Sequence, residues 1–580
     1  MGSARKPEAT LAEIAPRSSY AHGTGDIPLL GCCLGEVLDT SARSYPQQDA
    51  LVVRHQNLRY TYRQFLEEVE LVARGLLRLG IQKEDRIGMW ATNCAEWVIT
   101  QFSTAKIGAI LVNINPANRA FELEYVLRQS ECSGLLLIQG FRDADYVSIV
   151  NALCPELASA KPGELRSVSL PHLRNLVFIG GGKQAGMFHW DDLREMGRSV
   201  PEKDLRTREA ALSFDDPINI QYTSGTTGFP KGATLSHHNI ANNALLIAAA
   251  MKLTHRDRLC IPVPFYHCFG MVLGNLACAV TGATMVIPAA FFDPLATLEA
   301  VQAERCTALH GVPTMFIAEL DHPEFARFDL STLRTGIMAG APCPIEVMKR
   351  VVQLMHLKEM TIAYGLTEAS PVITQTTVDD PLELRVTTVG KPLPHTEVKI
   401  VDVITGEIVP RGTPGELCTR GYMVMKGYFK NAEATGKSID EDGWLHSGDL
   451  ATMDAKDYCK ITGRAKDVII RGGENIYPRE IEEFLYTCPG ISDVQVIGVP
   501  DAKYGEQVVA WVRLDANSKL SPEDIRKFCE GKIAAYKIPK SVKIVESFPM
   551  TVTGKIQKFK MREMSTQELG LETTAKIETA

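Results

Sequence analysis

The sequence has no marked excess of charge of either sign and no paired cysteine motif, and each absence excludes a class of protein. The formal net charge is −7 over 580 residues, without the basic footprint that indicates nucleic-acid binding. None of the 14 cysteines forms a C-x-x-C pair, so neither a zinc site nor a disulfide framework is predicted. We therefore expect reduced thiols, as in a cytosol-like compartment.

The first residues lack the features of a secretory signal. Residues 1–26 have mixed charge and no apolar stretch, and the acidic Glu8 and Glu13 are untypical of an organelle-targeting leader. We expect residues 1–26 to be a disordered extension and the protein to be cytoplasmic. The alternative is the mitochondrial matrix, with a leader absent or removed.

One long segment, Cys268 to Phe292, carries no charged side chain. It is long enough to cross a bilayer as a helix. However, glycines, Asn275 and Pro288 interrupt it. We therefore predict a buried helix, a turn at Thr281-Gly282 and a buried strand at Thr284–Ile287, as found in α/β cores, and no transmembrane segment.

Length and pattern predict an α/β protein with more than one domain. A chain of 580 residues exceeds what one hydrophobic core normally supports. In the first half, strand patterns such as 87–91 and 109–113 alternate with helical patterns, which predicts two parallel-type sheet subdomains covered by helices. Short alternating runs at about 389–430 predict a small antiparallel β-barrel or distorted sheet. After Gly463 the pattern predicts a small α+β module.

The stretch Thr223–Gly232 reads TSGTTGFPKG and is rich in hydroxyl side chains and glycine, with one lysine. Bare glycine backbone lets amide N–H groups approach an anion, hydroxyls add donors, and a lysine adds positive charge, so the stretch predicts a polyphosphate cradle between two strands. Pro230 before the lysine distinguishes it from a Walker A loop. The alternative is a flexible polar loop. The predicted phosphate-binding residues are Thr223, Ser224, Gly225, Thr226, Thr227, Gly228 and Lys231.

A second group, Tyr364–Glu368 (YGLTE), follows a predicted strand, where open α/β sheets expose a ligand crevice. Tyr364 could stack on a base, Thr367 could donate to phosphate, and Glu368 could hold Mg²⁺ through oxygen. The alternative is a strand-to-loop corner with a solvated glutamate. From these residues alone, the two interpretations are equally supported.

These two motifs, and others that follow in the same order between about Leu51 and Arg562, resemble the adenylate-forming superfamily. Its members are acyl-CoA synthetases, luciferases and the adenylation domains of peptide synthetases. The resemblance implies an AMP-binding domain over 27–463, a hinge at 464–466 and a mobile C-terminal domain over 467–580. It also implies ATP, Mg²⁺ and coenzyme A as cofactor and co-substrates. It supports the nucleotide-binding interpretation of Tyr364, Thr367 and Glu368.

The resemblance assigns further residues of this chain to the nucleotide. Ala339-Gly-Ala-Pro342 is similar to the family's adenine strand, with alanine in place of its first glycine. Asp449, in the motif GWLHSGD, would accept hydrogen bonds from both ribose hydroxyls. Arg464 would contact the ribose side of AMP. The adenine-strand residues predicted to bind the nucleotide are Gly340, Ala341 and Pro342.

It also assigns residues to the acyl group, the thiol and the motion between two half-reactions. His267, in Pro264-Phe-Tyr-His267, would be a gate between the adenylate site and the thiol tunnel, although a lone histidine after two aromatics is more often structural. Lys466 would be the hinge residue. Lys555, in Pro549-Met-Thr-Val-Thr-Gly-Lys555, would be the catalytic lysine of adenylation. The residues expected to line the pantetheine tunnel are Gly472 and Gly473.

The expected acyl pocket is small or apolar and offers no partner for a substrate amino group. Its residues are Cys268, Gly270, Met271, Gly274, Met338 and Ala363. Together with the runs RGGENIYPREIE and GKIQKFK, the pattern is most similar to medium-chain fatty acyl-CoA synthetases. The predicted partners are therefore a fatty acid, ATP and CoA. The alternatives are an aryl or branched acid, transfer to a carrier-protein thiol, luciferase-like oxidation, or a non-enzymatic acyl-AMP or lipid-binding relative.

Overall fold

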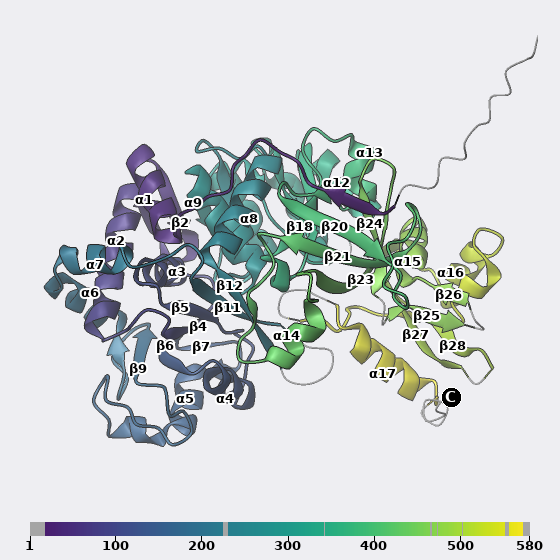
Figure 1. Cartoon of the computed structure of the whole chain (residues 1–580). Helices are drawn as coiled ribbons and strands as arrows, with labels where there is room; N and C mark the ends of the chain where they lie inside the picture. The colour runs from purple at the N-terminus through teal and green to yellow at the C-terminus, as the bar shows by residue number, and fades with distance from the viewer. Residues whose placement is uncertain are drawn as a thin grey trace, which may run out of the picture.

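The computed structural model describes residues 18–223, 230–341, 343–464, 467–471, 474–501, 503–551 and 556–571. In Figure 1 the chain runs from the purple N-terminal helices at the left to the yellow C-terminal module at the right. Within the described residues, the strands form four main sheets and one small hairpin. The α/β class predicted from the sequence is confirmed, with two large mostly parallel sheets, one antiparallel sheet and a small α+β module.

The first sheet has eight strands in the order β10-β9-β6-β4-β5-β11-β12-β22. Its strands are β4 (Arg86–Trp90), β5 (Ile110–Asn113), β6 (Cys132–Ile138), β9 (Asn175–Ile179), β10 (Phe188–His189), β11 (Pro217–Thr223), β12 (Lys231–Ser236) and β22 (Gly427–Tyr428). The helices in this part of the chain are α2 (Tyr62–Arg78), α3 (Ala95–Ile107), α4 (Ala120–Gln129), α5 (Tyr146–Leu153), α6 (Trp190–Ser199) and α7 (Glu202–Glu209). The small hairpin β7 (Gly140–Phe141) and β8 (Ala144–Asp145) lies before α5.

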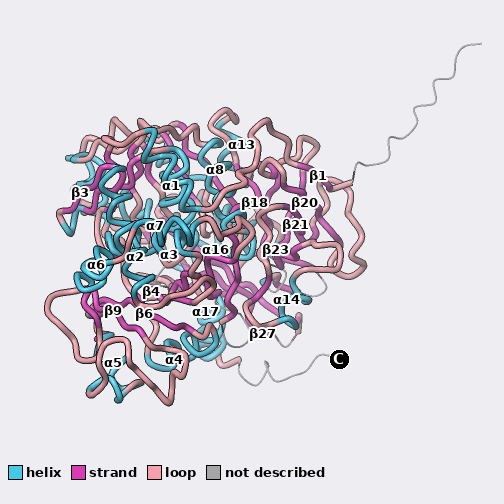
Figure 2. Tube along the Cα trace, turned by 60° about the vertical axis from the view of Figure 1, so that its left-hand side comes forward, coloured by secondary structure: helices cyan, strands magenta, loops and turns pink. Residues whose placement is uncertain are grey.

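Both faces of this sheet are buried, which explains its nearly continuous apolar strands. Leu135 and Leu137 of β6 belong to the hydrophobic cluster shared with α4 and α5. Leu136 points the other way and joins the cluster that contains α2 and α3. Figure 2 shows α4 and α5 on one side of β4, β6 and β9, and α2 and α3 on the other.

The second sheet has nine strands in the order β19-β18-β17-β16-β15-β13-β14-β2-β3. Its strands are β2 (Asp49–Val53), β3 (Leu58–Thr61), β13 (Arg258–Cys260), β14 (Thr284–Ile287), β15 (Ala308–Leu309), β16 (Thr335–Met338), β17 (Glu359–Gly365), β18 (Val372–Gln375) and β19 (Lys391–Pro392). Its helices are α1 (Leu34–Ser44), α8 (His237–Ala250), α9 (Ala277–Thr281), α10 (Pro294–Ala303), α11 (Pro313–Leu320), α12 (Ile345–Leu354) and α13 (Leu382–Thr387). Leu51 and Leu259 on one face and Val52 and Cys260 on the other belong to separate hydrophobic clusters, so this sheet is also buried on both sides.

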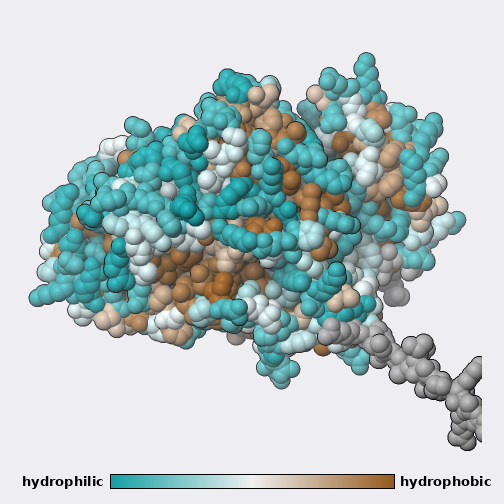
Figure 3. All heavy atoms as spheres, turned by 90° about the horizontal axis from the view of Figure 1, so that it is seen from above, coloured by the Kyte–Doolittle hydropathy of each residue, from teal (hydrophilic) through white to brown (hydrophobic). Residues whose placement is uncertain are grey.

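The uncharged segment folds as predicted. Residues Phe269–Leu276 form a buried π-helix that continues into α9, Gly282 ends the helix at a φ of 76°, and β14 follows. A π-helix of this length is rare and frequently marks a functional site. Among the described residues, no helix is long and apolar enough to span a membrane. Seen from above, most of the surface is hydrophilic, with apolar residues showing in patches between polar ones (Figure 3).

The third sheet is antiparallel, in the order β1-β20-β21-β23-β24. Its strands are β1 (Tyr20–His22), β20 (Thr396–Val401), β21 (Gly415–Gly421), β23 (Leu445–Met453) and β24 (Cys459–Arg464), and α14 (Ala432–Ser438) lies beside it. Two expectations need correction. The barrel-like unit predicted for 389–430 continues to Arg464, because β23 and β24 complete the sheet. The disordered extension predicted up to Asp26 is wrong for Tyr20–His22, which pairs with β20 and buries Ala21.

The C-terminal module has the strand order β26-β25-β28-β27, with β29 added beside β28. Its elements are β25 (Ile469–Arg471), β26 (Glu474–Ile476), α15 (Pro478–Tyr486), β27 (Ile491–Asp501), β28 (Gly505–Leu514), α16 (Pro522–Cys529), β29 (Ser541–Ile544) and α17 (Lys558–Glu568). Ser521 and Asp524 form a capping box at α16. Thr61 and Gln64 do the same at α2.

Candidate functional site

The predicted phosphate loop lies between two hydrogen-bonded strands, as the sequence indicated. Thr223 ends β11 and Lys231 begins β12, and the two residues are partners in the antiparallel register. The Thr223 hydroxyl donates to the Lys231 carbonyl oxygen at 3.4 Å. The predicted Ser224, Gly225, Thr226, Thr227 and Gly228 lie outside the described residues.

Lys231 and Glu368 are brought together by a residue that the sequence did not indicate, Tyr428. The Lys231 Nζ atom lies 4.6 Å from the centroid of the Tyr428 ring. The Tyr428 hydroxyl donates to Glu368 Oε1 at 2.7 Å. Burial, followed by the nearby charge of Glu368, raises the pKa of Tyr428, so the phenol remains a donor at neutral pH. Tyr428 therefore links a cation to the carboxylate predicted to hold a metal.

Sheet register explains this arrangement. In β22, Tyr428 pairs with Ala233 of β12, two positions beyond Lys231. Residues two apart on a strand share a face of the sheet. No sequence motif connects Tyr428 to Glu368, which is 60 residues away. The only local feature is that an aromatic residue directly follows Gly427. This feature does not indicate that Tyr428 contacts Glu368.

The segment that carries Glu368 is held by backbone contacts. The Glu368 carbonyl oxygen accepts from the Met425 N–H at 2.9 Å. The buried Ser370 hydroxyl donates to the Met423 carbonyl oxygen at 2.6 Å. Gly365 is required for close approach, because a Cβ atom there would lie 1.8 Å from the carbonyl oxygen of Pro371. The YGLTE corner is therefore a packed structure, with Thr367 and Glu368 half-buried at its tip.

The donor chemistry of Glu368 fits a hard divalent cation. Oε1 accepts the Tyr428 hydrogen bond, and no described residue donates to Oε2 or pairs with it. A carboxylate oxygen in this condition is a suitable ligand for Mg²⁺, which prefers one or two protein carboxylates together with water and substrate phosphate.

A second cluster surrounds Asp449, the predicted ribose ligand. The Tyr364 hydroxyl donates to Asp449 Oδ2 at 2.8 Å, and Arg464 Nε donates to Oδ1 at 2.9 Å. Asp449 and Arg464 are register partners on β23 and β24. Burial, followed by the charge of Asp449, raises the pKa of Tyr364, so its hydroxyl also remains a donor. Each carboxylate oxygen keeps a further lone pair for a ligand hydroxyl.

The predicted adenine strand lies at the end of β16. Ala339, where the family pattern has glycine, is buried and its N–H donates to the Gly311 carbonyl oxygen at 3.3 Å. Gly340 has a φ of +83°, which strongly favours glycine, and an added Cβ atom would lie 3.1 Å from Val312 Cγ1. Ala341 follows and is half-buried. Pro342 lies outside the described residues.

The predicted gate, His267, stands at the start of the π-helix. Its Nδ1 atom accepts from the Phe269 N–H at 3.1 Å, which is a structural contact. Its role as a gate remains a prediction. Next to it, the Cys268 thiol donates to Gln221 Oε1 at 3.0 Å. Burial raises the pKa of the Cys268 thiol, and the negative charge of Glu368 adds to this effect.

All six residues predicted to line the acyl pocket are buried. Four of them lie in or immediately before the π-helix, and two lie on adjacent parallel strands of the second sheet. They are Cys268, Gly270, Met271, Gly274, Met338 and Ala363.

The C-terminal module contacts the large domain beside the adenine strand. Arg479 of α15 donates to the Cys343 carbonyl oxygen at 3.3 Å, and the Ile345 N–H donates to Glu483 Oε2 at 3.4 Å. Burial raises the pKa of Glu483, and the positive charge of Arg479 opposes this effect. The predicted Lys466, Gly472, Gly473 and Lys555 lie outside the described residues.

The geometry therefore joins two polar clusters through one segment, Tyr364–Glu368. Comparison with known proteins shows the family to which the chain belongs. Residues 38–429 match the family described as AMP-binding enzyme, and residues 480–555 match the AMP-binding enzyme C-terminal domain. The chain belongs to the AMP-binding enzyme family.

Its curated relatives are acyl-CoA synthetases. The chain is 55% identical over 543 residues to the putative acyl-CoA synthetase YngI of Bacillus subtilis, covering 94% of this chain and 99% of that protein. It is 46% identical over 556 residues to the mitochondrial medium-chain acyl-CoA ligase ACSF2 of Danio rerio, covering 96% and 92% of the two chains. The chain is thus an adenylate-forming ligase of the acyl-CoA synthetase class, as the sequence motifs predicted.

Solved structures share the fold. The anthranilate CoA ligase AuaEII, crystallised with anthranoyl-AMP, has a TM-score of 0.82 and 27% identity, covering 94% of this chain and 99% of that chain. ATP-bound MatB from Rhodopseudomonas palustris has a TM-score of 0.78 and 27% identity, covering 93% and 100%.

The position of Tyr428 gives a testable prediction. Tyr428→Phe keeps the ring beneath Lys231 but removes the donor to Glu368. Because hydrogen bonds to charged groups contribute about 1.5–3 kcal/mol, we expect adenylation to fall roughly 10- to 100-fold, with more Mg²⁺ needed for half-maximal rate. The measurement is acid-dependent pyrophosphate release across a Mg²⁺ titration.

A matched control is Tyr458→Phe, which removes a tyrosine–carboxylate hydrogen bond to Asp380 at 2.5 Å away from the two clusters. It should leave the Mg²⁺ dependence unchanged. An unaltered Mg²⁺ dependence in Tyr428→Phe would contradict the proposed link.

Proposed function

We propose that this enzyme converts a fatty acid, preferably of medium chain length, to acyl-CoA through an acyl-adenylate, releasing AMP and pyrophosphate. The observation that carries the proposal is the pair of clusters joined by Tyr364–Glu368. One cluster pairs a lysine with a carboxylate suited to metal-bound phosphates. The other holds a nearly buried aspartate suited to a ribose diol.

The first half-reaction requires two anions, the carboxylate and ATP, to approach each other. Lys231 would lie against the β- and γ-phosphates, Thr223 and Thr367 would donate to phosphate oxygens, and Asp449 would hold the ribose in register. Glu368 would hold Mg²⁺, which supplies charge neutralisation at the phosphates when bound. Lys555 would steady the acyl carboxylate and the α-phosphate. A side-chain nucleophile is not required, because the acyl oxygen itself attacks the α-phosphorus.

For the second half-reaction, we infer that the C-terminal domain, 467–580, rotates about the hinge 464–466. The rotation would withdraw Lys555 and bring Gly472 and Gly473 to the site, where their bare backbone would line a narrow channel for the thiol of CoA. His267 would open or close the passage between that channel and the adenylate. Domain motions of this kind limit the turnover rate of many enzymes.

The apolar character of the pocket supports the choice of a fatty acid. Its six predicted residues offer no carboxylate to pair with an amino group, and the ACSF2 relatives are named as medium-chain acyl-CoA ligases. An aryl acid is the second candidate, because the similar structure AuaEII is named as an anthranilate CoA ligase. Within this proposal the enzyme works in the cytoplasm. The mitochondrial matrix is the alternative, since the ACSF2 relatives are named as mitochondrial proteins.

The deciding experiment measures pyrophosphate release with saturated acids of graded length and with aryl acids, each with and without CoA. We expect acid-dependent release, acyl-CoA formation when CoA is present, and the highest kcat/KM for medium-length chains. A preference for benzoate-type acids would replace the fatty-acid assignment. Adenylation without any CoA-dependent product would favour a carrier-protein thiol as acceptor, and no acid-dependent release would overturn the proposal.

A further inference from the structure

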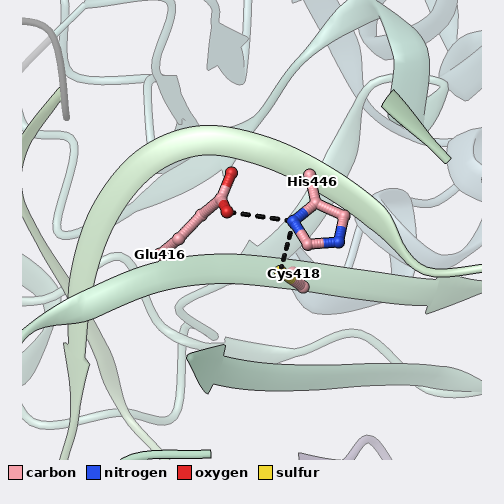
Figure 4. Close-up of side chains that lie close together, drawn as sticks. All are labelled: Glu416, Cys418 and His446. Atoms are coloured by element: carbon pink, nitrogen blue, oxygen red, sulfur yellow. Dashed lines mark hydrogen bonds and ion pairs between the residues drawn. The ribbon is translucent and has the colours of Figure 1, made fainter. Parts of the chain in front are cut away.

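Three side chains with metal-ligating atoms converge on the third sheet, outside the two nucleotide clusters. Glu416 and Cys418 lie two residues apart on β21, and His446 is the register partner of Cys418 on β23 (Figure 4). The His446 Nδ1 atom lies 2.9 Å from Glu416 Oε2 and 3.4 Å from Cys418 Sγ. All three donor atoms lie within 4.8 Å of one another.

Hydrogen bonding alone does not account for both contacts of the His446 Nδ1 atom. A ring nitrogen of histidine has one hydrogen or one lone pair in the ring plane, so Nδ1 can make one good hydrogen bond. Here it has two close partners, a carboxylate oxygen and a sulfur, both aimed at the same atom (Figure 4). A cation placed between the three atoms would be bound by all of them at once.

The far side of the imidazole supports the same interpretation. The His446 Nε2 atom faces Asp440 Oδ2 at 3.7 Å. The other oxygen of Asp440 accepts from the Trp444 N–H at 2.8 Å, so the position of this carboxylate is fixed by the backbone. Metal-binding histidines typically direct their second ring nitrogen to a carboxylate, which sets the tautomer and the ring orientation.

We propose that Glu416, Cys418 and His446 form a binding site for a zinc-like divalent cation. Nitrogen, sulfur and carboxylate oxygen together suit Zn²⁺ and similar transition metals, and three protein ligands leave a fourth position for water. Zinc–ligand bonds of about 2.0–2.3 Å in a tetrahedron separate the ligand atoms by roughly 3.3–3.5 Å. The observed 2.9 and 3.4 Å are close to this separation.

Access to the site is from the histidine side. The His446 side chain is 35% exposed and that of Glu416 is 18% exposed, whereas Cys418 is buried behind them. Cysteine spacing, from which no zinc site was predicted, gives no sign of this cluster. The cluster contains a single cysteine, and its three side chains come from two strands.

The cation site shares a carboxylate with the turn that presents Asp449. Glu416 Oε1 accepts from the Gly448 N–H at 2.9 Å, while Oε2 belongs to the cluster. Gly448 has a φ of +70° and immediately precedes Asp449. A cation that reorients Glu416 would therefore shift this turn. This coupling rests on the proposed role of Asp449 in nucleotide binding, whereas the cation site itself does not.

The test titrates the metal-free full-length protein with Zn²⁺, and separately with Co²⁺ as a spectroscopic probe. We expect one equivalent of zinc and a thiolate-to-cobalt charge-transfer band. Both should be lost in Cys418→Ser and weakened at least 10-fold in Glu416→Gln. Cys32→Ser, which removes a half-buried thiol elsewhere, should retain both. Thermal unfolding of each variant checks that it is folded, and the partly exposed Glu416 position keeps the test valid if Cys418→Ser is unstable.

Retention of the zinc equivalent and the cobalt band in both Cys418→Ser and Glu416→Gln would overturn the site, as would no zinc binding by the wild-type protein. The coupling is measured as AMP affinity with and without Zn²⁺. A change in the wild-type protein that is absent in Cys418→Ser supports it. Zinc binding without a change in AMP affinity would overturn the coupling alone. Failure to bind AMP at all would count against the proposed function and leave the metal titration unaffected.

Discussion

Lys555→Ala is expected to slow acyl-adenylate formation strongly while thioester formation from supplied acyl-AMP stays close to the wild-type rate. In the proposed scheme, this lysine stabilises charge at the α-phosphate only during the first half-reaction. Loss of one such electrostatic donor typically costs about 3–4 kcal/mol, which corresponds to roughly 100- to 1,000-fold in rate. The two half-reactions are measured separately, as pyrophosphate release from acid and ATP and as acyl-CoA formation from synthetic acyl-AMP and CoA.

The flanks of this lysine belong to the C-terminal module. Met550 and Ile556 form an antiparallel bridge, and the Gln557 N–H donates to the Pro549 carbonyl oxygen at 2.8 Å. The matched control is Lys560→Ala, which removes an exposed positive charge from the same region and should change neither half-reaction. Equal loss of both half-reactions in Lys555→Ala would contradict the division of labour between them.

Much of the fold could be predicted because local pattern and burial agree. Strands such as β4 and β6 are apolar on both faces and alternate with amphipathic helices, which is typical of covered parallel sheets. The capping box of Thr61 with Gln64 at the start of α2 is also a local feature, because it depends on residues three positions apart. Edges of sheets were harder to predict. The strand Tyr20–His22 is three residues long and gains its order from pairing with β20, which is remote in sequence.

In the candidate site too, local motifs could be recognised in the sequence, whereas contacts between distant strands could not. Lys231, Glu368 and Asp449 were predicted as site residues from short motifs, in which the relevant residue types lie within a few positions of one another. Tyr428 was missed because its contact with Glu368 is created by the register between β12 and β22. The cluster of Glu416, Cys418 and His446 was missed for the same reason, since two strands supply its members. Pairings between distant strands are set by tertiary structure, which single-sequence patterns do not encode.

Lys466→Pro is expected to produce the opposite result to Lys555→Ala. Adenylation should be retained, and thioester formation should fall on the order of 100-fold, which is the size of effect expected when reacting groups are misplaced. The physical reason is that proline fixes φ near −65° and removes a backbone donor, so the hinge can no longer absorb a domain rotation. Arg464 on one side is held by Asp449, and Ile469 on the other begins the sheet of the C-terminal module. In the proposed scheme, the rotation would therefore be taken up between these two residues.

Two hydrogen bonds that join described residues of the two domains are long. Arg479 to Cys343 and Ile345 to Glu483, at 3.3 and 3.4 Å, are near the long limit of hydrogen bonds. Lys466→Ala is the matched control, because it removes the charge but keeps the torsional freedom, and it should retain both half-reactions. If Lys466→Pro forms thioester from supplied acyl-AMP at the wild-type rate, the two half-reactions share one arrangement of the domains. The glycines at 472 and 473 would then need an explanation other than a thiol channel that domain rotation brings to the acyl-adenylate.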